Sequence, residues 1–349
     1  MIEWPVSTRT LEKRDETLTP EALRDRYGRR IDYLRISLID HCNLRCVYCM
    51  PLHGLKFLRR QNLLTPGEIA TIAQAGVQVG FRKIRLTGGE PTLRPDLVEI
   101  VERLADLQSS GLQTLALTTN GIKLPELAKP LKAAGLTRVN IHVDTVNPGS
   151  LRRLMRWGEL EQIMAGIYAA EEAGLTPIKL NSVVMRGYND DDVAELAALT
   201  LEHPWHVRFI ETMPLGTQAN EAIRGYVSSA EVRQRIEAVH SPLEPLYEGE
   251  LRGEARMFRI RGARGEIGFI SPVSEPYCDD CNRLRLTADG KIRLCLLTDH
   301  ELDFREALHN GGPQTLRQLF IRAVTAKPVG HELRRGISPA ARGMSQIGG

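Results

Sequence analysis

Three cysteines close together near the start of the chain are the feature that most constrains its fold. They lie in Cys42-Asn-Leu-Arg-Cys46-Val-Tyr-Cys49, directly after an apolar run at residues 33–39. A tight loop can bring thiols at this spacing onto one small inorganic centre. A [4Fe–4S] cluster is normally held by four thiolates, so three would leave one iron open for chemistry. A structural zinc site, which takes four ligands, is the alternative, with His41 or His53 as the fourth.

A second group of three cysteines lies far along the chain, at Cys278, Cys281 and Cys295. A spacing of two residues followed by a further ligand is common in structural zinc sites. The absence of a nearby fourth cysteine favours a second cluster with its own open iron. The two groups together contain all 6 cysteines of the chain. This usage indicates metal sites in a reducing cytoplasm and not a secreted disulfide framework.

Apolar runs rich in β-forming residues alternate with segments of helical spacing. Strands are predicted at residues 33–39, 83–87, 114–119, 138–144, 178–185 and 206–212. Helices are predicted at 66–80, from Pro95-Asp96 to about 108, near 124–134, at 159–174 and at 190–202, the last with Asn189-Asp-Asp-Asp192 as its acidic first turn. Continuous apolar strands alternating with helices indicate an α/β protein with a parallel sheet that helices cover.

Polar residues follow several of these strands, which favours an incomplete TIM-type (βα)6 barrel over an open sheet, because the βα loops of a barrel gather at one mouth. The segments are Thr87-Gly-Gly-Glu-Pro91, Thr118-Thr-Asn-Gly121, Asn140-Ile-His-Val-Asp144, Lys179, and Glu211-Thr-Met-Pro214. Two glycines let the backbone approach a ligand closely. Glu90 offers a carboxylate to a cationic group.

The βα rhythm stops at about residue 217. A helix at 229–239 precedes shorter strands predicted at 257–261, 265–270, 283–287 and 291–296, with Ala288-Asp-Gly290 as a hairpin turn. The sequence therefore predicts an N-terminal arm (1–26), a barrel (27–225), a smaller C-terminal α+β module (226–330) and a tail (331–349).

Charge is nearly balanced, with 46 basic and 43 acidic residues in 349 and a net charge of +3. This balance argues against a general nucleic-acid or membrane-surface binder. No apolar stretch is long enough to span a membrane, and the first residues lack the apolar region of a secretory signal. Basic residues cluster at 82–85, 152–156 and 283–285, where they could meet one polyanionic ligand. Because no G-x4-G-K-[ST] loop occurs, side chains must supply the charge for a phosphate.

The first cysteine loop resembles the radical S-adenosylmethionine (SAM) superfamily, whose motif is C-x3-C-x-aromatic-C after a first strand. Tyr48 fills the aromatic position. The resemblance implies that the amino and carboxylate groups of SAM bind the open iron, and that one-electron reduction then yields a 5′-deoxyadenosyl radical. It also implies that the Gly-Gly-Glu segment grips the methionine amino group.

A more specific resemblance is carried by the first cysteine loop, by the stretch from Cys281-Asn-Arg-Leu-Arg-Leu to Cys295, and by the terminal Gly348-Gly349. Together these motifs are similar to the GTP 3′,8-cyclase family, lyases of molybdenum cofactor biosynthesis. The resemblance implies two [4Fe–4S] clusters, SAM as cofactor and GTP as substrate. The implied metal ligands are Cys42, Cys46, Cys49, Cys278, Cys281 and Cys295. The implied SAM-binding residues are Tyr48, Gly89, Glu90, His142 and Met213. The implied GTP-binding residues are Arg35, Arg85, Thr118, Lys179, Arg283, Leu284 and Arg285, and the implied catalytic residues are Arg35, Arg283, Arg285, Gly348 and Gly349.

The same resemblance implies a reductant protein such as flavodoxin or ferredoxin, and a homodimer. One position departs from the family pattern, which usually has Ser where this chain has His142. Two other functions stay open on the residues. One is a different radical SAM enzyme with an auxiliary cluster, such as a peptide maturase, and the other is a non-enzymatic zinc-binding interaction protein.

Overall fold

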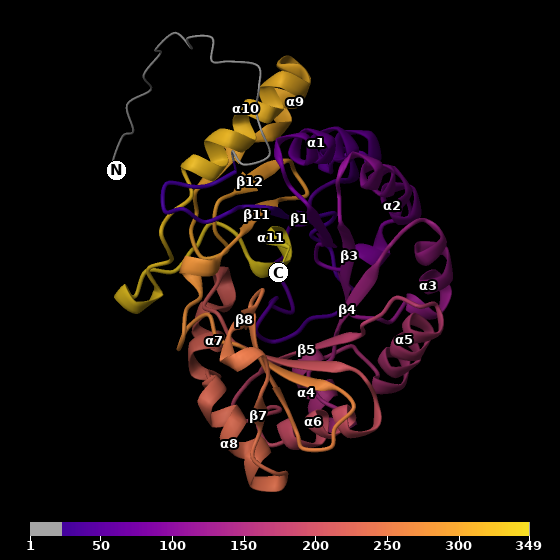
Figure 1. Ribbon diagram of the computed structural model, residues 1–349, viewed down its shortest axis with the longest axis vertical. Coiled ribbons are helices and arrows are strands. Elements are labelled where there is room, and N and C mark those ends of the chain that lie inside the picture. Colours follow the sequence, from indigo (N-terminus) through magenta and orange to yellow (C-terminus); the bar gives the residue numbers. More distant parts are fainter. Residues whose placement is uncertain (1–22, 349) are drawn as a thin grey trace.

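A computed structural model describes residues 23–348, and its centre is a parallel sheet of six consecutive strands. The strands are β1 (Tyr33–Ser37), β2 (Lys83–Thr87), β3 (Thr114–Thr119), β4 (Arg138–His142), β5 (Lys179–Val184) and β6 (His206–Glu211). Each pairs in parallel with the next along the chain. The connecting helices are α1 (Pro66–Val79), α2 (Leu97–Ala105), α3 (Leu124–Ala133), α4 (Pro148–Met155), α5 (Leu160–Glu172) and α6 (Val193–Glu202). They form an outer ring around the strands (Figure 1), so the predicted incomplete (βα)6 barrel is confirmed.

Strands from the C-terminal part of the chain extend this sheet at both of its edges. The later strands are β7 (Glu244–Pro245), β8 (Leu251–Arg252), β9 (Ala255–Arg259), β10 (Glu266–Ile270), β11 (Arg283–Leu286), β12 (Lys291–Arg293) and β13 (Glu301–Asp303). β10 pairs in parallel with β6, and β11 pairs in parallel with β1. The result is a 13-stranded sheet in the order β13-β12-β11-β1-β2-β3-β4-β5-β6-β10-β9-β7, with β8 paired to β9. The predicted domain boundaries therefore cross a continuous sheet and stay a prediction.

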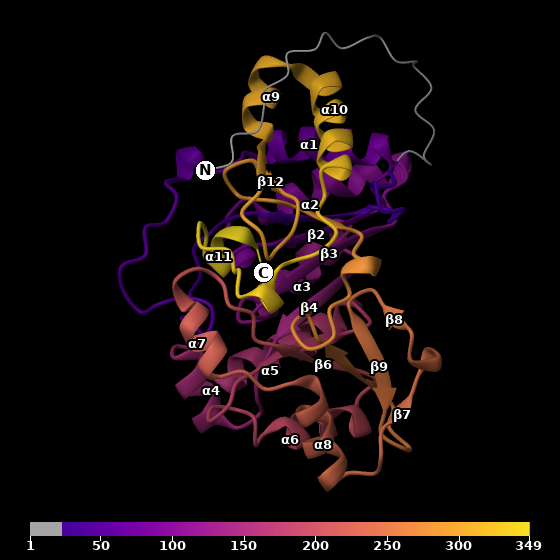
Figure 2. The same ribbon diagram turned by 90° about the vertical axis from the view of Figure 1, so that its left-hand side faces the viewer.

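The remaining helices flank the C-terminal strands and the mouth of the barrel. They are α7 (Ala219–Arg224), α8 (Ser229–Val239), α9 (Phe304–Asn310), α10 (Gly312–Thr325) and α11 (Met344–Ile347). α10 packs against α1, where Phe320 contacts Phe81 and Phe304 at ring-centroid distances of 5.1 and 4.8 Å. Figures 1 and 2 show α11 inside the ring of strands. Within residues 23–348, no helix has the length and apolar character needed to cross a bilayer.

Local signals explain several element boundaries. The α1 helix begins with a capping box between Thr65 and Glu68 and ends at Gly80, whose φ of +117° suits a residue without a side chain. The acidic run predicted as the first turn of a helix instead precedes α6, which begins at Val193. Asn189 explains the difference, because its amide donates to the carbonyls of Asp144 and Val183 and holds the run in a turn.

The arm predicted at residues 1–26 lies mostly outside the described part of the chain. Its last residues are packed against the body of the protein: Leu23 is buried, and Asp25 forms an ion pair with Arg29 at 2.6 Å. The guanidinium of Arg29 also donates to the carbonyls of Cys278 and Val329, at 2.7 and 2.8 Å. Arg29, just after the predicted arm, therefore supports the second cysteine group, and Asp25 at the end of the arm holds its guanidinium.

Candidate functional site

The first three cysteines lie in the loop that follows β1, at the mouth of the barrel. The loop is held from outside by the end of α4, because Arg45 N and Val47 N donate to the carbonyls of Met155 and Leu154 at 3.3 and 3.0 Å. Gln218 donates to the carbonyl of Val47 at 2.6 Å. These backbone contacts fix the loop without using any of its thiols, which all line one cavity.

Thiol geometry in both cysteine groups fits a cluster better than a single ion. Zinc–sulfur bonds of about 2.3 Å place the ligands of one zinc ion within about 4 Å of one another. Among the described residues, the group of three ligand atoms found within 4.8 Å of one another is Cys46, His142 and Asp144, and neither cysteine triplet forms such a group. The wider spacing suits the larger Fe–S cage. Burial raises the pKa values of Cys42 and Cys49 to about 12, so the thiols are protonated until a metal displaces the protons.

The second triplet lies where the chain enters and leaves the β11–β12 hairpin. A buried lysine, Lys327, donates to the carbonyls of Arg283 and Leu294, at 2.8 and 2.7 Å, and so joins the two strands beside the cysteines. Burial alone would raise the pKa of Cys281, but the positive charges of Lys327 and Arg283 outweigh it and lower that pKa. The surroundings of Cys281 therefore suit a thiolate, whereas burial raises the pKa of Cys278.

The two triplets face connected parts of the barrel interior. One cavity is lined by Cys42, Cys46 and Cys49, and a second by Cys278, Cys281 and Cys295. The two cavities share the lining residues Met213, Tyr277, Arg283, Arg285 and Leu296. A molecule that fills both cavities would therefore lie against both triplets.

All five residues that the resemblance assigns to SAM line the first cavity. These are Tyr48, Gly89, Glu90, His142 and Met213. The Tyr48 hydroxyl lies 2.6 Å from His142 Nε2 and donates to Asp144 at 3.0 Å. Burial alone would lower the pKa of His142, but the Asp144 carboxylate outweighs it and raises that pKa. The ring that stands in place of the usual Ser is thus part of a closed hydrogen-bonded group beside Cys46.

The Gly88–Gly89 segment approaches the chain's own backbone. A Cβ on Gly88 would lie 2.5 Å from the carbonyl oxygen of Ile39, and one on Gly89 would lie 2.3 Å from that of His41. The glycines therefore let the loop after β2 pack against the residues just before Cys42, while both still line the cavity. The sequence suggested that these glycines let the backbone approach a ligand. In the structure they let it approach another loop of the protein.

Glu90 is held by the loop after β3. Its carboxylate accepts from Thr92 N, Thr119 Oγ1 and Asn120 N at 3.0, 2.7 and 2.7 Å. Glu90 is 1% exposed, and burial raises its pKa. Its carboxylate thus joins two loops at the cavity wall, and its grip on the SAM amino group stays a prediction.

Six basic side chains meet deeper in the barrel, and we call them the cationic cluster: Arg35, Arg85, Arg138, Lys179, Arg208 and Arg283. Parallel register explains their meeting, because Arg35 pairs with Arg85 across β1 and β2. Arg85 donates to the hydroxyls of Tyr33 and Thr118. Sequence reasoning found four of the six. It missed Arg138 and Arg208. Both lie next to apolar residues in a strand, and this alternation indicates that the arginine side chains point to the face opposite the apolar ones.

Arg283 and Arg285 line both cavities, whereas Leu284 between them lies in the hydrophobic core. Because successive strand residues face opposite sides of a sheet, the Leu284 side chain points away from the site. Of the basic group at 152–156, Arg152 instead pairs with Glu159 at the surface, at 2.8 Å.

The chain's last described residues lie in the site, next to the β11–β12 hairpin. The carbonyl of Gly348 accepts from Arg285 Nη1 at 2.7 Å, and Met344 and Ser345 line the first cavity. A Cβ on Gly348 would lie 2.3 Å from Thr87 Oγ1, and the residue has a φ of +78°. Only glycine fits there without a shift. Gly349, the other predicted tail residue, lies outside the described residues.

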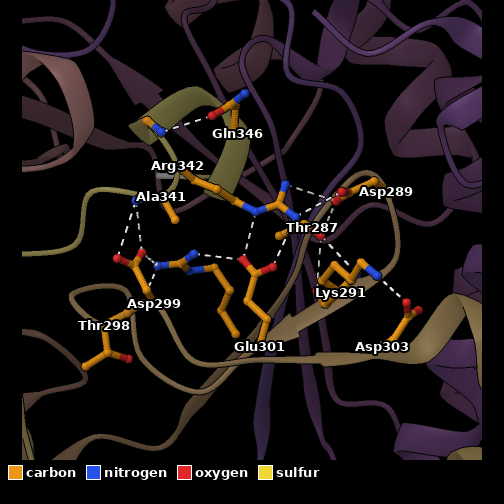
Figure 3. Close-up of polar contacts among 12 residues, drawn as sticks. Thr287, Asp289, Lys291, Thr298, Asp299, Glu301, Asp303, Ala341, Arg342 and Gln346 are labelled. Atoms are coloured by element: carbon orange, nitrogen blue, oxygen red, sulfur yellow. Dashed lines mark hydrogen bonds and ion pairs between the residues drawn. The ribbon is translucent and has the colours of Figure 1, made fainter. Parts of the chain in front are cut away.

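A polar group at the base of the tail fixes its path (Figure 3). Arg342 forms ion pairs with Asp289 at 2.9 Å and with Glu301 at 2.8 Å. Ala341 N donates to Asp299 Oδ2 at 3.3 Å. The tail is therefore attached to the turn of the β11–β12 hairpin through Asp289, and to the connection into β13 through Asp299 and Glu301.

Comparison with known proteins agrees with these features. Residues 36–200 match the family model of the radical SAM superfamily, and residues 205–333 match that of Molybdenum Cofactor Synthesis C. The chain is 47% identical to the GTP 3′,8-cyclase of Moorella thermoacetica over 328 residues, which cover 94% of the chain and 100% of the relative. It is 44% identical to that of Pelotomaculum thermopropionicum, with the same coverage.

Among solved structures, Streptococcus suis SuiB bound to S-adenosylmethionine superposes with a TM-score of 0.57. The superposition covers 82% of this chain and 67% of SuiB at 14% identity, so it supports the fold alone. The identity and coverage of the relatives favour neither the peptide maturase nor the zinc-binding alternative. From its motifs, its site and these relatives, the chain belongs to the GTP 3′,8-cyclase family of the radical SAM superfamily.

Proposed function

We propose that this chain converts GTP to 3′,8-cyclo-7,8-dihydro-GTP in the cavity between its two cysteine triplets. Cys42, Cys46 and Cys49 would hold one [4Fe–4S] cluster, and Cys278, Cys281 and Cys295 the other. The observation that carries the proposal is that the two triplets border cavities with five shared lining residues. GTP would lie between them with its base toward the second triplet.

When bound, the first cluster and SAM would supply a 5′-deoxyadenosyl radical able to take the hydrogen from C3′ of the ribose. C3′ then forms a bond to C8 of guanine, and one electron and one proton complete the product. The protein's own part is to hold the two carbons close together and to exclude water and other hydrogen donors from the radical. Tyr48, Gly89, Glu90, His142 and Met213, which line the first cavity, are the proposed SAM contacts.

The cationic cluster is the proposed site of the triphosphate. Buried donors without a partner, Arg35 Nε and Arg138 Nε, support this assignment. Guanidinium groups suit phosphate because their planar fork makes paired, charge-assisted hydrogen bonds. Thr118 and Arg285 would complete the nucleotide contacts at the cavity wall. Arg35, Arg283, Arg285 and the Gly348–Gly349 tail are the proposed catalytic group.

Partners and compartment are part of the same proposal. Chemistry at a [4Fe–4S] cluster of this kind starts with one-electron reduction, so we assign a reductant protein of the flavodoxin or ferredoxin type. The six free cysteines suit a reducing cytoplasm. A homodimer follows from the family resemblance alone.

Isotope transfer tests the proposed function. The anaerobically reconstituted, reduced protein should convert GTP deuterated at C3′ and transfer that deuterium to 5′-deoxyadenosine. A variant with Cys295→Ser should still cleave SAM but make no cyclic product. Unlabelled 5′-deoxyadenosine alongside cyclic product, or a Cys295→Ser variant with the wild-type rate, would contradict the proposal.

A further inference from the structure

One acidic side chain lies within the cationic cluster, and the proposed mechanism does not use it. Glu254 is at the tip of the β8–β9 hairpin, in the two-residue turn Gly253–Glu254. Its carboxylate lies 3.4 Å from Arg283 Nη1 and 3.9 Å from Arg208 Nη1, and its side chain is 14% exposed. Within residues 23–348, neither arginine has another ion pair, so Glu254 is the counter-ion of both.

Glu254 interacts with the whole cluster and not only with these two arginines. Burial alone would raise the pKa of Glu254, but the surrounding guanidinium groups outweigh it and hold that pKa below its usual range. Burial and neighbouring cations lower the pKa values of Arg138 and Lys179, and the negative charge of Glu254 partly opposes that lowering. One carboxylate facing six cations leaves a large excess of positive charge, which suits a second, more highly charged anion.

The carboxylate lies next to two arginines that would also serve a phosphate. A carboxylate and a phosphate compete for the same N–H groups of a guanidinium, and Glu254 lies next to Nη1 of both Arg208 and Arg283. A triphosphate that binds through these Nη1 groups must therefore displace Glu254. With the acid in place, like charges would repel across a few ångströms of buried space, which is costly.

The hairpin has room to withdraw. A third cavity lies on the outer side of the turn, lined by Lys83, Glu250, Leu251, Gly253, Arg256, Asp280 and Asn282. Gly253 has a φ of +79°, and a Cβ placed on it would meet nothing within 4 Å. β8 is attached to the sheet through β9, by the pairs Leu251–Arg256 and Arg252–Ala255. Moving the turn outward would break the hydrogen bond from Arg283 Nη2 to the Gly253 carbonyl, at 3.4 Å, together with the two ion pairs of Glu254.

We propose that Glu254 is an exchangeable counter-ion, which neutralises the cationic cluster in the absence of nucleotide and is displaced by the triphosphate of the substrate. The inference rests on the proposed function, since it takes the cluster to be the triphosphate site. Glu254 then sets the affinity for GTP by competing with it. The competition weakens binding of ligands with a polyphosphate and leaves binding of the nucleoside part unchanged.

Binding measurements on the reconstituted holoprotein test this directly. In Glu254→Gln, which keeps the shape and removes the charge, GTP and inorganic tripolyphosphate should each bind about tenfold more tightly than in the wild type, because one charged competitor for the arginines is gone. Guanosine should bind equally to both proteins. The matched control is Glu250→Gln, which removes an exposed acid at the base of the same hairpin and should change none of the three affinities.

An unchanged or weaker affinity for GTP in Glu254→Gln, with normal binding by the wild type, would overturn the inference and leave the proposed function intact. A wild-type protein that binds GTP with no competition from tripolyphosphate would instead contradict the placement of the triphosphate.

A measurement on the wild type does not depend on how well the variant folds. Tripolyphosphate should increase amide hydrogen exchange at residues 253–255, and unchanged or slower exchange there would equally reject displacement of the turn.

Discussion

Single residues at the site show two kinds of constraint, steric at Gly348 and electrostatic at Lys179. Gly348 lies where a side chain would strike Thr87, and its carbonyl accepts from Arg285. Lys179 is half-buried in the cationic cluster. Both were assigned roles from family resemblance, and the contacts add a physical reason for each. The sequence alone could not supply these reasons, since both depend on neighbours far away in the chain.

Gly348→Ala should uncouple SAM cleavage from cyclisation. The new methyl group would meet Thr87 Oγ1 at 2.3 Å and require a φ of +78°, so the tail would move away from Arg285. We expect the rate of cyclisation to fall about tenfold or more, because losing a positioning contact worth roughly 1.4 kcal/mol in the transition state slows a reaction about tenfold. More 5′-deoxyadenosine should form per cyclic product. Gly343→Ala is the control, because a Cβ there meets nothing within 4 Å. Equal coupling ratios in both variants would show that the Gly348 contact is irrelevant.

The affinity for GTP should fall as pH rises through about 8. Burial, together with the charges of Arg208, Arg138 and Arg85, lowers the pKa of Lys179 to about 8. The ammonium is therefore present below that pH and lost above it, while a bound triphosphate favours the charged form and raises the pKa again. Binding near pH 8.5 should take up protons, measurable by calorimetry in buffers of different ionisation enthalpy. Lys179→Met should abolish the proton uptake on binding. If the variant still takes up protons, a group other than Lys179 is being protonated.

At the scale of elements, the strands were predictable and several helices were not. Continuous apolar runs located β1–β6 to within about two residues, because a barrel strand is buried on both faces. The prediction omitted α4, whose start is capped by Asn147, and also α9 and α10. The strand expected at 291–296 ends at Arg293, since the chain leaves the sheet to bring Cys295 to its site. Tertiary contacts decided these boundaries.

The tail depends on its attachment at Arg342. Arg342→Ala should remove the ion pairs to Asp289 and Glu301 and lower the free energy of unfolding by about 1–3 kcal/mol. With its base released, α11 should exchange amide hydrogens faster, and cyclisation should fall more than SAM cleavage does. Arg335→Ala removes an exposed cation from the same tail and should change neither property. If the amide hydrogens of α11 exchange at the wild-type rate in Arg342→Ala, the tail must be held by other contacts.

At the scale of the whole molecule, one sheet connects the two cysteine groups. β11 pairs with β1, so the strand that precedes the first triplet lies beside the strand that links Cys281 to Cys295. Sequence reasoning predicted both triplets and the barrel, but treated the C-terminal strands as a separate module. Their pairing across 250 positions leaves no periodic signal in the chain. The sheet thus explains how distant motifs come to face one cavity.

Metal analysis of cysteine variants tests the central claim most directly, that each triplet holds its own [4Fe–4S] cluster. Protein prepared without oxygen should contain about eight irons and eight sulfides per chain, four of each per cluster. Replacing Cys42, Cys46 and Cys49 by Ala should leave about four of each, and so should replacing Cys278, Cys281 and Cys295. One zinc per triplet, or complete loss of iron when either triplet alone is replaced in a folded protein, would contradict the account.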